Sequence, residues 1–219
     1  MKKNSGELII IEHPLIECYL SRLRDCKTVT NDFRRYLKKI ALLMSYPISQ
    51  YLMTINTEVQ TPYGKAQGSR LVKPIAIFPI MRSGLMMSTV IEEILEVDLV
   101  SPLGIRRNRE TLMPECYYTN MPKALNEYDC FVIDPMLATG KIMSTAIEFL
   151  ENRNAKTIIL VSLIAAPEGI KYIQSKKDNI SIFCCKVDSG LNSKGYIVPG
   201  LGDVGDRAFG GLDNALIIK

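Results

Sequence analysis

Apolar and polar residues recur along the chain in patterns that predict alternating strands and helices. Residues 31 to 44 carry an apolar side chain every three or four positions, with basic side chains between them, which predicts an amphipathic helix capped by Thr30 or Asn31. Four later apolar runs are typical of buried parallel strands: 75–81, 131–137, 157–166 and 180–187. Helical patterns follow the first three: 85–95, 144–153 and 167–176. This order predicts an α/β fold with a largely parallel central sheet flanked by helices.

The stretch from 106 to 122 interrupts this order with charged residues and two adjacent tyrosines. It predicts an excursion from the core, a β-arm or a lid. We assign residues 1–219 to a single domain. Within it we expect an N-terminal helical segment over about 1–50, the arm over about 104–122 and a C-terminal loop over about 195–211.

Composition narrows the classes of function. The 27 Lys+Arg against 23 Asp+Glu give a net charge of +4, too small to indicate a nucleic-acid-binding protein but compatible with a local phosphate site. The single histidine, His13, excludes zinc sites built on several histidines, and we expect it to pack beside Pro14. Six cysteines without C-x-x-C spacing predict reduced, mostly buried thiols. The longest apolar stretch is far shorter than the ~20 residues that span a bilayer, so we expect a cytoplasmic protein that binds no membrane.

Glycine is concentrated near the end of the chain, where six of the 14 glycines fall between 195 and 211. This density predicts a loop shaped by its backbone. A literal G-x-G-x-x-G begins at Gly200, but too few residues follow it for a dinucleotide-binding unit. A second near match, at Thr139-Gly140-Lys141, lacks the flanking residues of a P-loop.

A more informative pattern starts within the second apolar run. Three hydrophobic residues, 131–133, are followed by Asp134, a loop with Thr139-Gly140 comes next, and a helix is expected to start near Met143. Main-chain N–H groups at a helix start bind anions, and a carboxylate one loop away can hold a sugar diol. Geometry alone leaves a phosphate cradle and an ordinary strand-to-helix turn equally open.

The run from Asp134 to Gly140 resembles the phosphoribosyl diphosphate signature of the uracil phosphoribosyltransferases. The likeness covers nearly the whole chain, through motifs in the family's order: His13-Pro-Leu with the helix from Phe33, Pro79-Ile-Met-Arg82-Ser-Gly84-Leu, Arg107-Asn-Arg-Glu110-Thr-Leu-Met-Pro114, Ala165-Ala-Pro-Glu168-Gly169-Ile and Tyr196-Ile-Val-Pro-Gly-Leu-Gly-Asp203-Val-Gly-Asp-Arg207. It implies a type I phosphoribosyltransferase fold. It also implies transfer of ribose 5-phosphate from phosphoribosyl diphosphate to N1 of uracil, which gives UMP and diphosphate in pyrimidine salvage.

The resemblance implies roles for individual residues. The implied catalytic residues are Asp134, Arg107 and Asp203. Phosphoribosyl diphosphate would be bound by Arg82, Arg107, Asp134, Pro135, Met136, Leu137, Ala138, Thr139, Gly140, Lys141, Ile142 and Asp203. Uracil would be read by main-chain groups at Ile197, Gly202, Asp203 and Val204. The implied cofactor is Mg²⁺, held mainly by the substrate diphosphate with Asp203 as a candidate ligand. A homodimer or larger homo-oligomer is implied, and GTP is a candidate effector.

Each of these residues also has an ordinary structural interpretation. Arg82 could simply end a loop, Arg107 could lie on a solvated face, Asp134 could cap a helix, and Asp203 could form an Asx turn. Lys141 and Ile142 stand where the family pattern has Gly and then Ser, which removes a hydroxyl donor to phosphate. Two alternatives therefore stay open: a catalytically weakened relative that binds uracil or a nucleotide in a regulatory role, and transfer to a different base.

Overall fold

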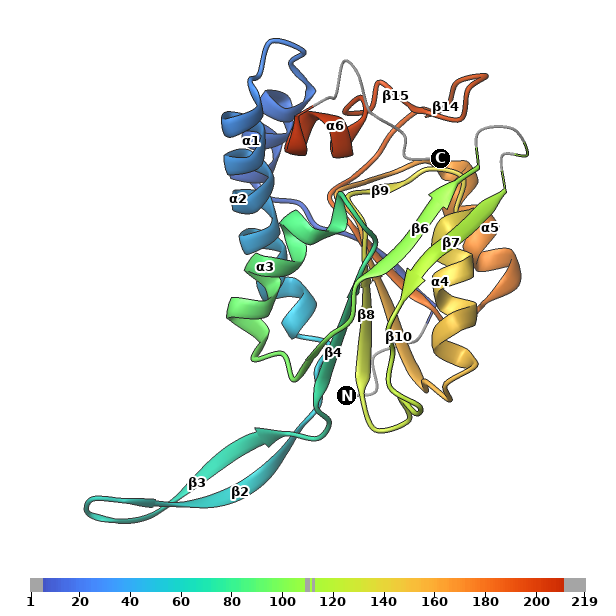
Figure 1. Ribbon diagram of the computed structural model, residues 1–219. Coiled ribbons are helices and arrows are strands. Elements are labelled where there is room, and N and C mark those ends of the chain that lie inside the picture. The colour runs from blue at the N-terminus through green and yellow to red at the C-terminus, as the bar shows by residue number, and fades with distance from the viewer. Residues whose placement is uncertain (1–5, 109–110, 112, 211–219) are drawn as a thin grey trace.

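The computed structural model describes residues 6–108, 111 and 113–210. Its centre is a parallel sheet of six strands in the order β1-β12-β10-β8-β4-β5 (Figure 1). In chain order these strands are β1 Leu8–Ile10, β4 Ile75–Pro79, β5 Leu99–Val100, β8 Asp129–Ile133, β10 Thr157–Val161 and β12 Ser181–Cys184. The expected α/β fold with a largely parallel sheet is confirmed.

Helices cover both faces of this sheet. On one face lie α1 Pro14–Arg24, α2 Thr30–Ser49 and α3 Gly84–Leu95, and on the other lie α4 Lys141–Glu151 and α5 Pro167–Lys176 (Figure 1). Every residue of β4 is buried, because its side chains alternate between two faces that are both covered by helices. Ile75 and Ile77 pack toward α2 and α3, and Phe78 packs in the core beneath α4. Continuous apolar runs therefore identified β4, β8, β10 and β12, whereas the short strands β1 and β5 were not predicted.

The helices match their predictions, with one correction. The first predicted helix, 31–44, is α2 and extends further at both ends. Its cap position is occupied by Val29, whose carbonyl accepts from the N–H of Phe33 at 2.9 Å, so neither Thr30 nor Asn31 is the cap. The helix starts one residue before the apolar periodicity shows, and Thr30 already lies in its first turn. His13, placed beside Pro14 as expected, caps α1 by accepting from the N–H of Leu15 at 3.1 Å.

Three of the predicted strands are each divided in two. The second halves are β9 Met136–Leu137, β11 Ile164–Ala165 and β13 Lys186–Val187, which form a separate parallel sheet in the order β13-β11-β9. One cause is Pro135, which has no N–H for the ladder and whose carbonyl accepts from the N–H groups of Leu163 and Ile164 at 3.0 and 3.1 Å. The prediction of single strands was wrong. The break places Asp134 in the gap between the two sheets.

Two hairpins extend from the sheet. β6 Leu103–Arg107 and β7 Pro114–Thr119 form the antiparallel arm predicted for this region, of which 109, 110 and 112 lie outside the described residues. The sequence did not predict the second hairpin, β2 Thr54–Thr61 and β3 Gly64–Leu71, which projects away from the body (Figure 1). Both of its strands are largely exposed on both faces, so no buried face imposes a regular alternation of apolar and polar residues.

The chain ends in the predicted glycine-rich loop, of which 211 lies outside the described residues. Two short strands, β14 Gly190–Leu191 and β15 Ile197–Val198, pair antiparallel, and the helix α6 Val204–Phe209 follows. None of the six cysteines is in a disulfide; three are buried, Cys116 is half-buried, and Cys18 and Cys26 are exposed, so fewer are buried than expected. Among the described residues, no helix is long and apolar enough to cross a membrane.

Candidate active site

The predicted site residues lie at the carboxyl edge of the parallel strands. Arg82 follows β4, Asp134 follows β8, and Arg107 is the last residue of β6. Asp203 directly precedes α6, which lies above the start of α3 in Figure 1. Parallel strands bring their carboxyl ends to one edge, and ligands of open α/β sheets bind beyond that edge. Segments from four parts of the sequence therefore meet at one place.

Asp134 is a buried carboxylate without a basic partner among the residues that the structure describes. Its Oδ1 accepts from the hydroxyl of Ser83 at 3.0 Å and, at 3.5 Å, from the N–H of Met136. Burial raises the pKa of Asp134 to about 7, and the hydrogen bonds from Ser83 and Met136 oppose that rise. The helix-cap interpretation is wrong, because α4 is preceded by Gly140. The side chain remains able to take on hydrogen-bond donors from a ligand.

The loop from Asp134 to Lys141 leads directly into α4. The helix begins at Lys141, two residues before the expected start at Met143, and Gly140 at its cap position has no side chain that could occupy the first N–H groups. Gly140 has a φ of 76°, and a Cβ there would lie 2.8 Å from the carbonyl oxygen of Gly169. A Cβ on Gly169 would lie 2.2 Å from the carbonyl oxygen of Ala138. Glycine at these two positions therefore lets the loop and α5 approach closely. The main-chain N–H groups at the start of α4 stay available to an anion.

Lys141 and Ile142 occupy the first turn of α4. The Lys141 ammonium lies 3.8 Å from the Sδ of Met113 on the arm. The Ile142 side chain is partly buried and packs against the apolar core. Ile142 can therefore contribute only its main-chain N–H to an anion, while Lys141 places a positive charge between α4 and the arm.

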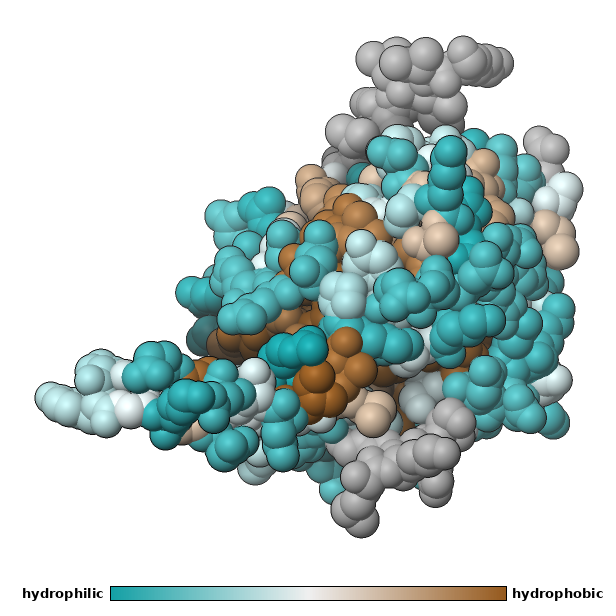
Figure 2. Space-filling model, turned by 90° about the horizontal axis from the view of Figure 1, so that it is seen from below, coloured by the Kyte–Doolittle hydropathy of each residue, from teal (hydrophilic) through white to brown (hydrophobic). Residues whose placement is uncertain are grey.

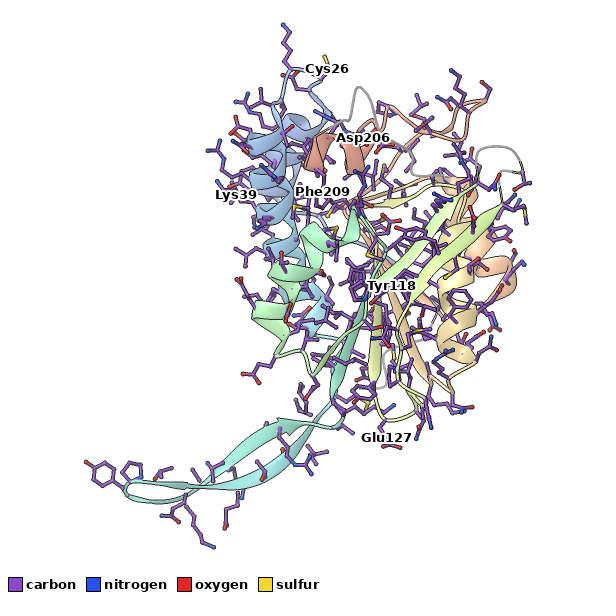
Figure 3. The ribbon with its side chains drawn as sticks, viewed as in Figure 1. Cys26, Lys39, Tyr118, Glu127, Asp206 and Phe209 are labelled. Carbon is purple, nitrogen blue, oxygen red and sulfur yellow. The ribbon has the colours of Figure 1, made fainter. Side chains whose placement is uncertain are left out.

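Arg82 connects the loop after β4 with the C-terminal helix. Its Nη2 lies 2.8 Å from Oδ1 of Asp206, and its guanidinium lies 5.9 Å from the ring centroid of Phe209. Figure 3 shows Asp206 and Phe209 on α6, next to the upper end of α3. Arg82 thus joins the loop after β4 to α6, and its contact with diphosphate stays a prediction. Sequence reasoning missed Asp206, although its place three residues after the capping Asp203 follows the capping-box spacing.

Two neighbouring arginines of β6 point to different surroundings. Arg106 pairs with Glu115 at 3.1 Å and lies over Tyr117, which places it on the solvated face of the arm. Arg107 donates to the carbonyl oxygen of Lys194 at 2.9 Å, and its guanidinium lies 5.8 Å from the ring centroid of Tyr196. The solvated-face interpretation therefore fits Arg106, and Arg107 joins the arm to the glycine-rich loop.

The glycine-rich loop presents main chain toward the same place. Asp203 is exposed and caps α6, with Oδ1 accepting from the N–H of Asp206 at 3.0 Å, so the Asx-type interpretation describes what this side chain does. Gly202 is exposed with a φ of 72°, whereas Ile197 and Val204 are buried. The buried side chains of Ile197 and Val204 anchor the loop, so only their main-chain polar groups stay available to a ligand.

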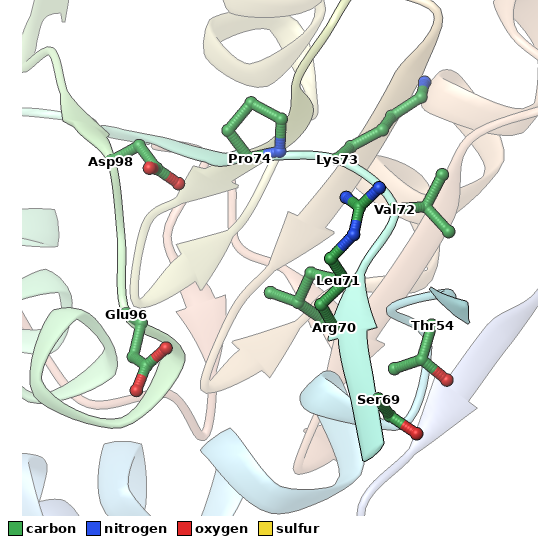
Figure 4. A pocket seen from close by; sticks show the side chains of 9 residues that line it. All are labelled: Thr54, Ser69, Arg70, Leu71, Val72, Lys73, Pro74, Glu96 and Asp98. Carbon is green, nitrogen blue, oxygen red and sulfur yellow. The ribbon is translucent and has the colours of Figure 1, made fainter. Parts of the chain in front are cut away.

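A separate hollow lies at the opposite edge of the sheet, where β3 leads into β4 (Figure 4). Its volume is about 560 Å³, and its lining is Thr54, Ser69, Arg70, Leu71, Val72, Lys73, Pro74, Glu96 and Asp98. Two of its polar groups serve the fold: Asp98 accepts from the N–H of Ile75 at 2.9 Å, and the Lys73 ammonium lies 3.8 Å from Asp129. No predicted site residue lines this hollow, so it is not the candidate active site.

Comparison with known proteins identifies the family and supports the fold. The family model for uracil phosphoribosyltransferase matches residues 10–211. The uracil phosphoribosyltransferase of Caldanaerobacter subterraneus subsp. tengcongensis is 44% identical over 93% of this chain and 97% of its own, and that of Finegoldia magna is 43% identical over 94% and 99%. A solved structure of an Aquifex aeolicus protein has a TM-score of 0.86 and 34% identity over 93% of this chain and 98% of its own.

A more distant structure shares the fold alone. The adenine phosphoribosyltransferase of Trypanosoma brucei, solved with AMP, pyrophosphate and ribose 5-phosphate, superposes with a TM-score of 0.58 at 10% identity over 87% of both chains. The family match, in contrast, covers all the motifs from the loop after β4 to the glycine-rich loop. The chain therefore belongs to the uracil phosphoribosyltransferase family.

Proposed function

We propose that this protein transfers ribose 5-phosphate from phosphoribosyl diphosphate to uracil, giving UMP and diphosphate. The observation that carries the proposal is Asp134, a buried carboxylate without a basic partner among the described residues, directly before a loop whose main chain can bind phosphate. Arg82 and Arg107 reach the same edge from separate elements. Family membership supplies the identity of both substrates.

The residues of this chain can bind the anionic substrate at three points. The main-chain N–H groups from Ala138 to Ile142 would receive the 5-phosphate at the start of α4. Asp134 would accept hydrogen bonds from the ribose hydroxyls, and these are strong because the acceptor is ionised. Arg82 and Arg107 would bind the diphosphate, since a guanidinium pairs with phosphate oxygens in a fork and keeps its charge.

The reaction breaks the bond between C1 of the ribose and a diphosphate oxygen and forms a bond between C1 and N1 of uracil. The N1 proton is released, and diphosphate leaves with the electron pair of the broken bond. Positive charge that develops on the ribose is stabilised by nearby anions. No histidine is needed, and His13 serves as a helix cap.

Mg²⁺ would be held at this site mainly by the substrate diphosphate and less by side chains of the protein. Among the described residues, no cluster of three or more potential ligands from His, Cys, Asp and Glu is present. Mg²⁺ commonly uses substrate phosphates with one or two carboxylates, and Asp203 offers an exposed carboxylate near Arg82 and Asp206. Bound Mg²⁺ would neutralise charge on the diphosphate as it leaves.

Production of UMP tests the proposed function directly. Purified protein would be incubated with labelled uracil, phosphoribosyl diphosphate and Mg²⁺, with Asp134→Ala as the baseline. We expect UMP and diphosphate in equal amounts, well above that baseline. Uracil binding without UMP would instead support the regulatory alternative, and turnover with a different base only would reassign the substrate. The variant Lys141→Gly with Ile142→Ser tests whether these two residues limit the rate.

We also propose that the protein is a homodimer or larger homo-oligomer in the cytoplasm. The β2–β3 hairpin supports self-association: an isolated two-stranded hairpin is marginally stable, and this one exposes Ile55, Val59 and Tyr63. Hydrophobic residues also gather beside its base (Figure 2). Sedimentation of the wild type and of Val59→Asp tests this, with dissociation expected in the variant and a monomeric wild type contradicting it. GTP activation remains a prediction from the family resemblance, tested by adding GTP to the UMP assay.

A further inference from the structure

The glycine-rich loop is held by a buried ion pair distant from it in sequence. Arg24, the last residue of α1, binds Asp188 through two parallel contacts, from Nη2 to Oδ1 at 2.6 Å and from Nη1 to Oδ2 at 2.9 Å. Only 3% of the Asp188 side chain is exposed. Such a bidentate pair fixes position and orientation together, because both guanidinium nitrogens have defined partners.

The same two side chains bind both polar main-chain groups of Gly200. The N–H of Gly200 donates to Oδ2 of Asp188 at 2.9 Å, and Nη1 of Arg24 donates to the carbonyl oxygen of Gly200 at 3.0 Å. Gly200 has a φ of 65°, and a Cβ there would lie 2.1 Å from the carbonyl oxygen of Ile197. Its backbone is therefore restrained by side-chain hydrogen bonds and by close packing.

A second arginine holds the following residue. Arg207 donates to the carbonyl oxygens of Leu201 at 2.8 Å and of Asp25 at 2.6 Å, and also to that of Leu23. Its guanidinium lies 4.3 Å from the ring centroid of Phe33 on α2. The end of α1 therefore serves as the anchor for Gly200 and Leu201 together.

We propose that Arg24 and Asp188 are positioning residues for uracil, because they fix the main-chain groups of Gly202 to Val204 through Gly200. This inference rests on the proposed binding of uracil at the glycine-rich loop. Recognition by main chain depends on the position of the backbone, and a displacement of about 1 Å can cost on the order of 10²-fold in rate. The anchor is two residues from the groups it would position, and neither of its side chains belongs to the implied ligand set.

Steady-state kinetics of Arg24→Lys and Asp188→Asn test the proposal. Lys keeps the charge but cannot bind Asp188 and Gly200 with one planar group, and Asn loses the charge at nearly constant shape. We expect the KM for uracil to rise about tenfold or more, with the KM for phosphoribosyl diphosphate within about twofold of wild type. The matched control is Lys186→Met, which breaks the exposed pair of Lys186 with Glu17 at 3.3 Å, between α1 and β13, and leaves the loop untouched.

Loss of one partner of a buried pair also destabilises a protein, so a second variant separates stability from positioning. Arg24→Met with Asp188→Leu replaces the pair by apolar side chains, which restores much of the stability but none of the hydrogen bonds to Gly200. We expect its melting temperature to recover while its KM for uracil stays high. Recovery of both, or equal changes in the two KM values, or no change in either, would overturn the proposal. A wild type that forms no UMP would instead overturn the proposed function.

Discussion

Asp134 and Asp188 are both buried aspartates, with 8% and 7% of the whole residue exposed, yet their surroundings differ in kind. Asp188 is fully engaged by Arg24 and the N–H of Gly200. Asp134 receives a hydroxyl and a distant N–H, and burial raises its pKa to about 7. A buried carboxylate normally requires a partner. Asp134, which has no cationic partner among the described residues, is therefore suited to binding a ligand. Asp188, which is paired with Arg24, stabilises the fold.

The same contrast distinguishes the two loops. The loop from Asp134 to Lys141 approaches α5 so closely that a Cβ on Gly140 or Gly169 would meet main-chain oxygen atoms. The glycine-rich loop is held by long side chains from α1 and from its own helix. Local substitutions should therefore damage the first loop, whereas the second should respond to changes far away in sequence.

The largest expected effect follows the removal of the charge on Asp134. Asp134→Asn loses two charge-assisted hydrogen bonds to the ribose, so we expect kcat/KM for phosphoribosyl diphosphate to fall by roughly 10²–10⁴-fold. Asp98→Asn is the control, since Asp98 also accepts a main-chain N–H but lies at the opposite edge. A loss below about tenfold in UMP formation would show that Asp134 is not the ribose acceptor.

The two arginines of β6 provide the next comparison. Arg107→Ala removes a guanidinium that faces the glycine-rich loop and, in our proposal, the diphosphate, so we expect the KM for phosphoribosyl diphosphate to rise about 10–100-fold. Arg106→Ala removes an exposed pair with Glu115, and such pairs contribute about 0–1 kcal/mol. Its KM should stay within about threefold of wild type. An equally small rise in KM in both variants would place both arginines on the solvated face.

Gly169→Ala should distort the loop from Asp134 to Lys141, because Gly169 lies against Ala138 of that loop. The added Cβ would meet the carbonyl oxygen of Ala138 at 2.2 Å, so the backbone must shift. We expect a stability loss of about 1–3 kcal/mol by denaturant unfolding and a weaker affinity for phosphoribosyl diphosphate. Gly68→Ala is the control, because its Cβ would meet only the side chains of Val59 and Thr57 on the hairpin. An unchanged affinity in Gly169→Ala would mean that the loop tolerates displacement.

The smallest effect concerns pH. Ribose hydroxyls donate to the ionised form of Asp134, so kcat/KM for phosphoribosyl diphosphate should fall as the pH drops through about 7. The Ser83 hydroxyl favours the ionised form and lowers the pKa, so Ser83→Ala should raise that pKa and move the acid limb to higher pH. Ser83→Thr keeps a hydroxyl and should leave the limb in place. An unmoved limb in Ser83→Ala would exclude Asp134 as the titrating group.

Sequence patterns predicted the core well, and they located the loop after β8 and the glycine-rich loop. Buried strands and amphipathic helices leave strong apolar periodicity, and the motif around Asp134 is contiguous in sequence. The β2–β3 hairpin was missed because its strands are largely exposed and no buried face imposes an alternation. Arg24 and Asp188 were missed for a different reason: they are 164 residues apart, and only the fold brings them together. Asp206 did leave a local signal, its spacing from Asp203.

Binding of phosphoribosyl diphosphate by Asp134→Asn and Asp188→Asn tests the central contrast most directly. Both substitutions remove one buried negative charge at nearly constant shape, and calorimetric titration with Mg²⁺ present requires no turnover. Our account predicts binding at least tenfold weaker in Asp134→Asn and within about twofold of wild type in Asp188→Asn. Wild-type affinity in Asp134→Asn, or equal losses in the two variants, would contradict the assignment of one aspartate to the ligand and the other to the scaffold.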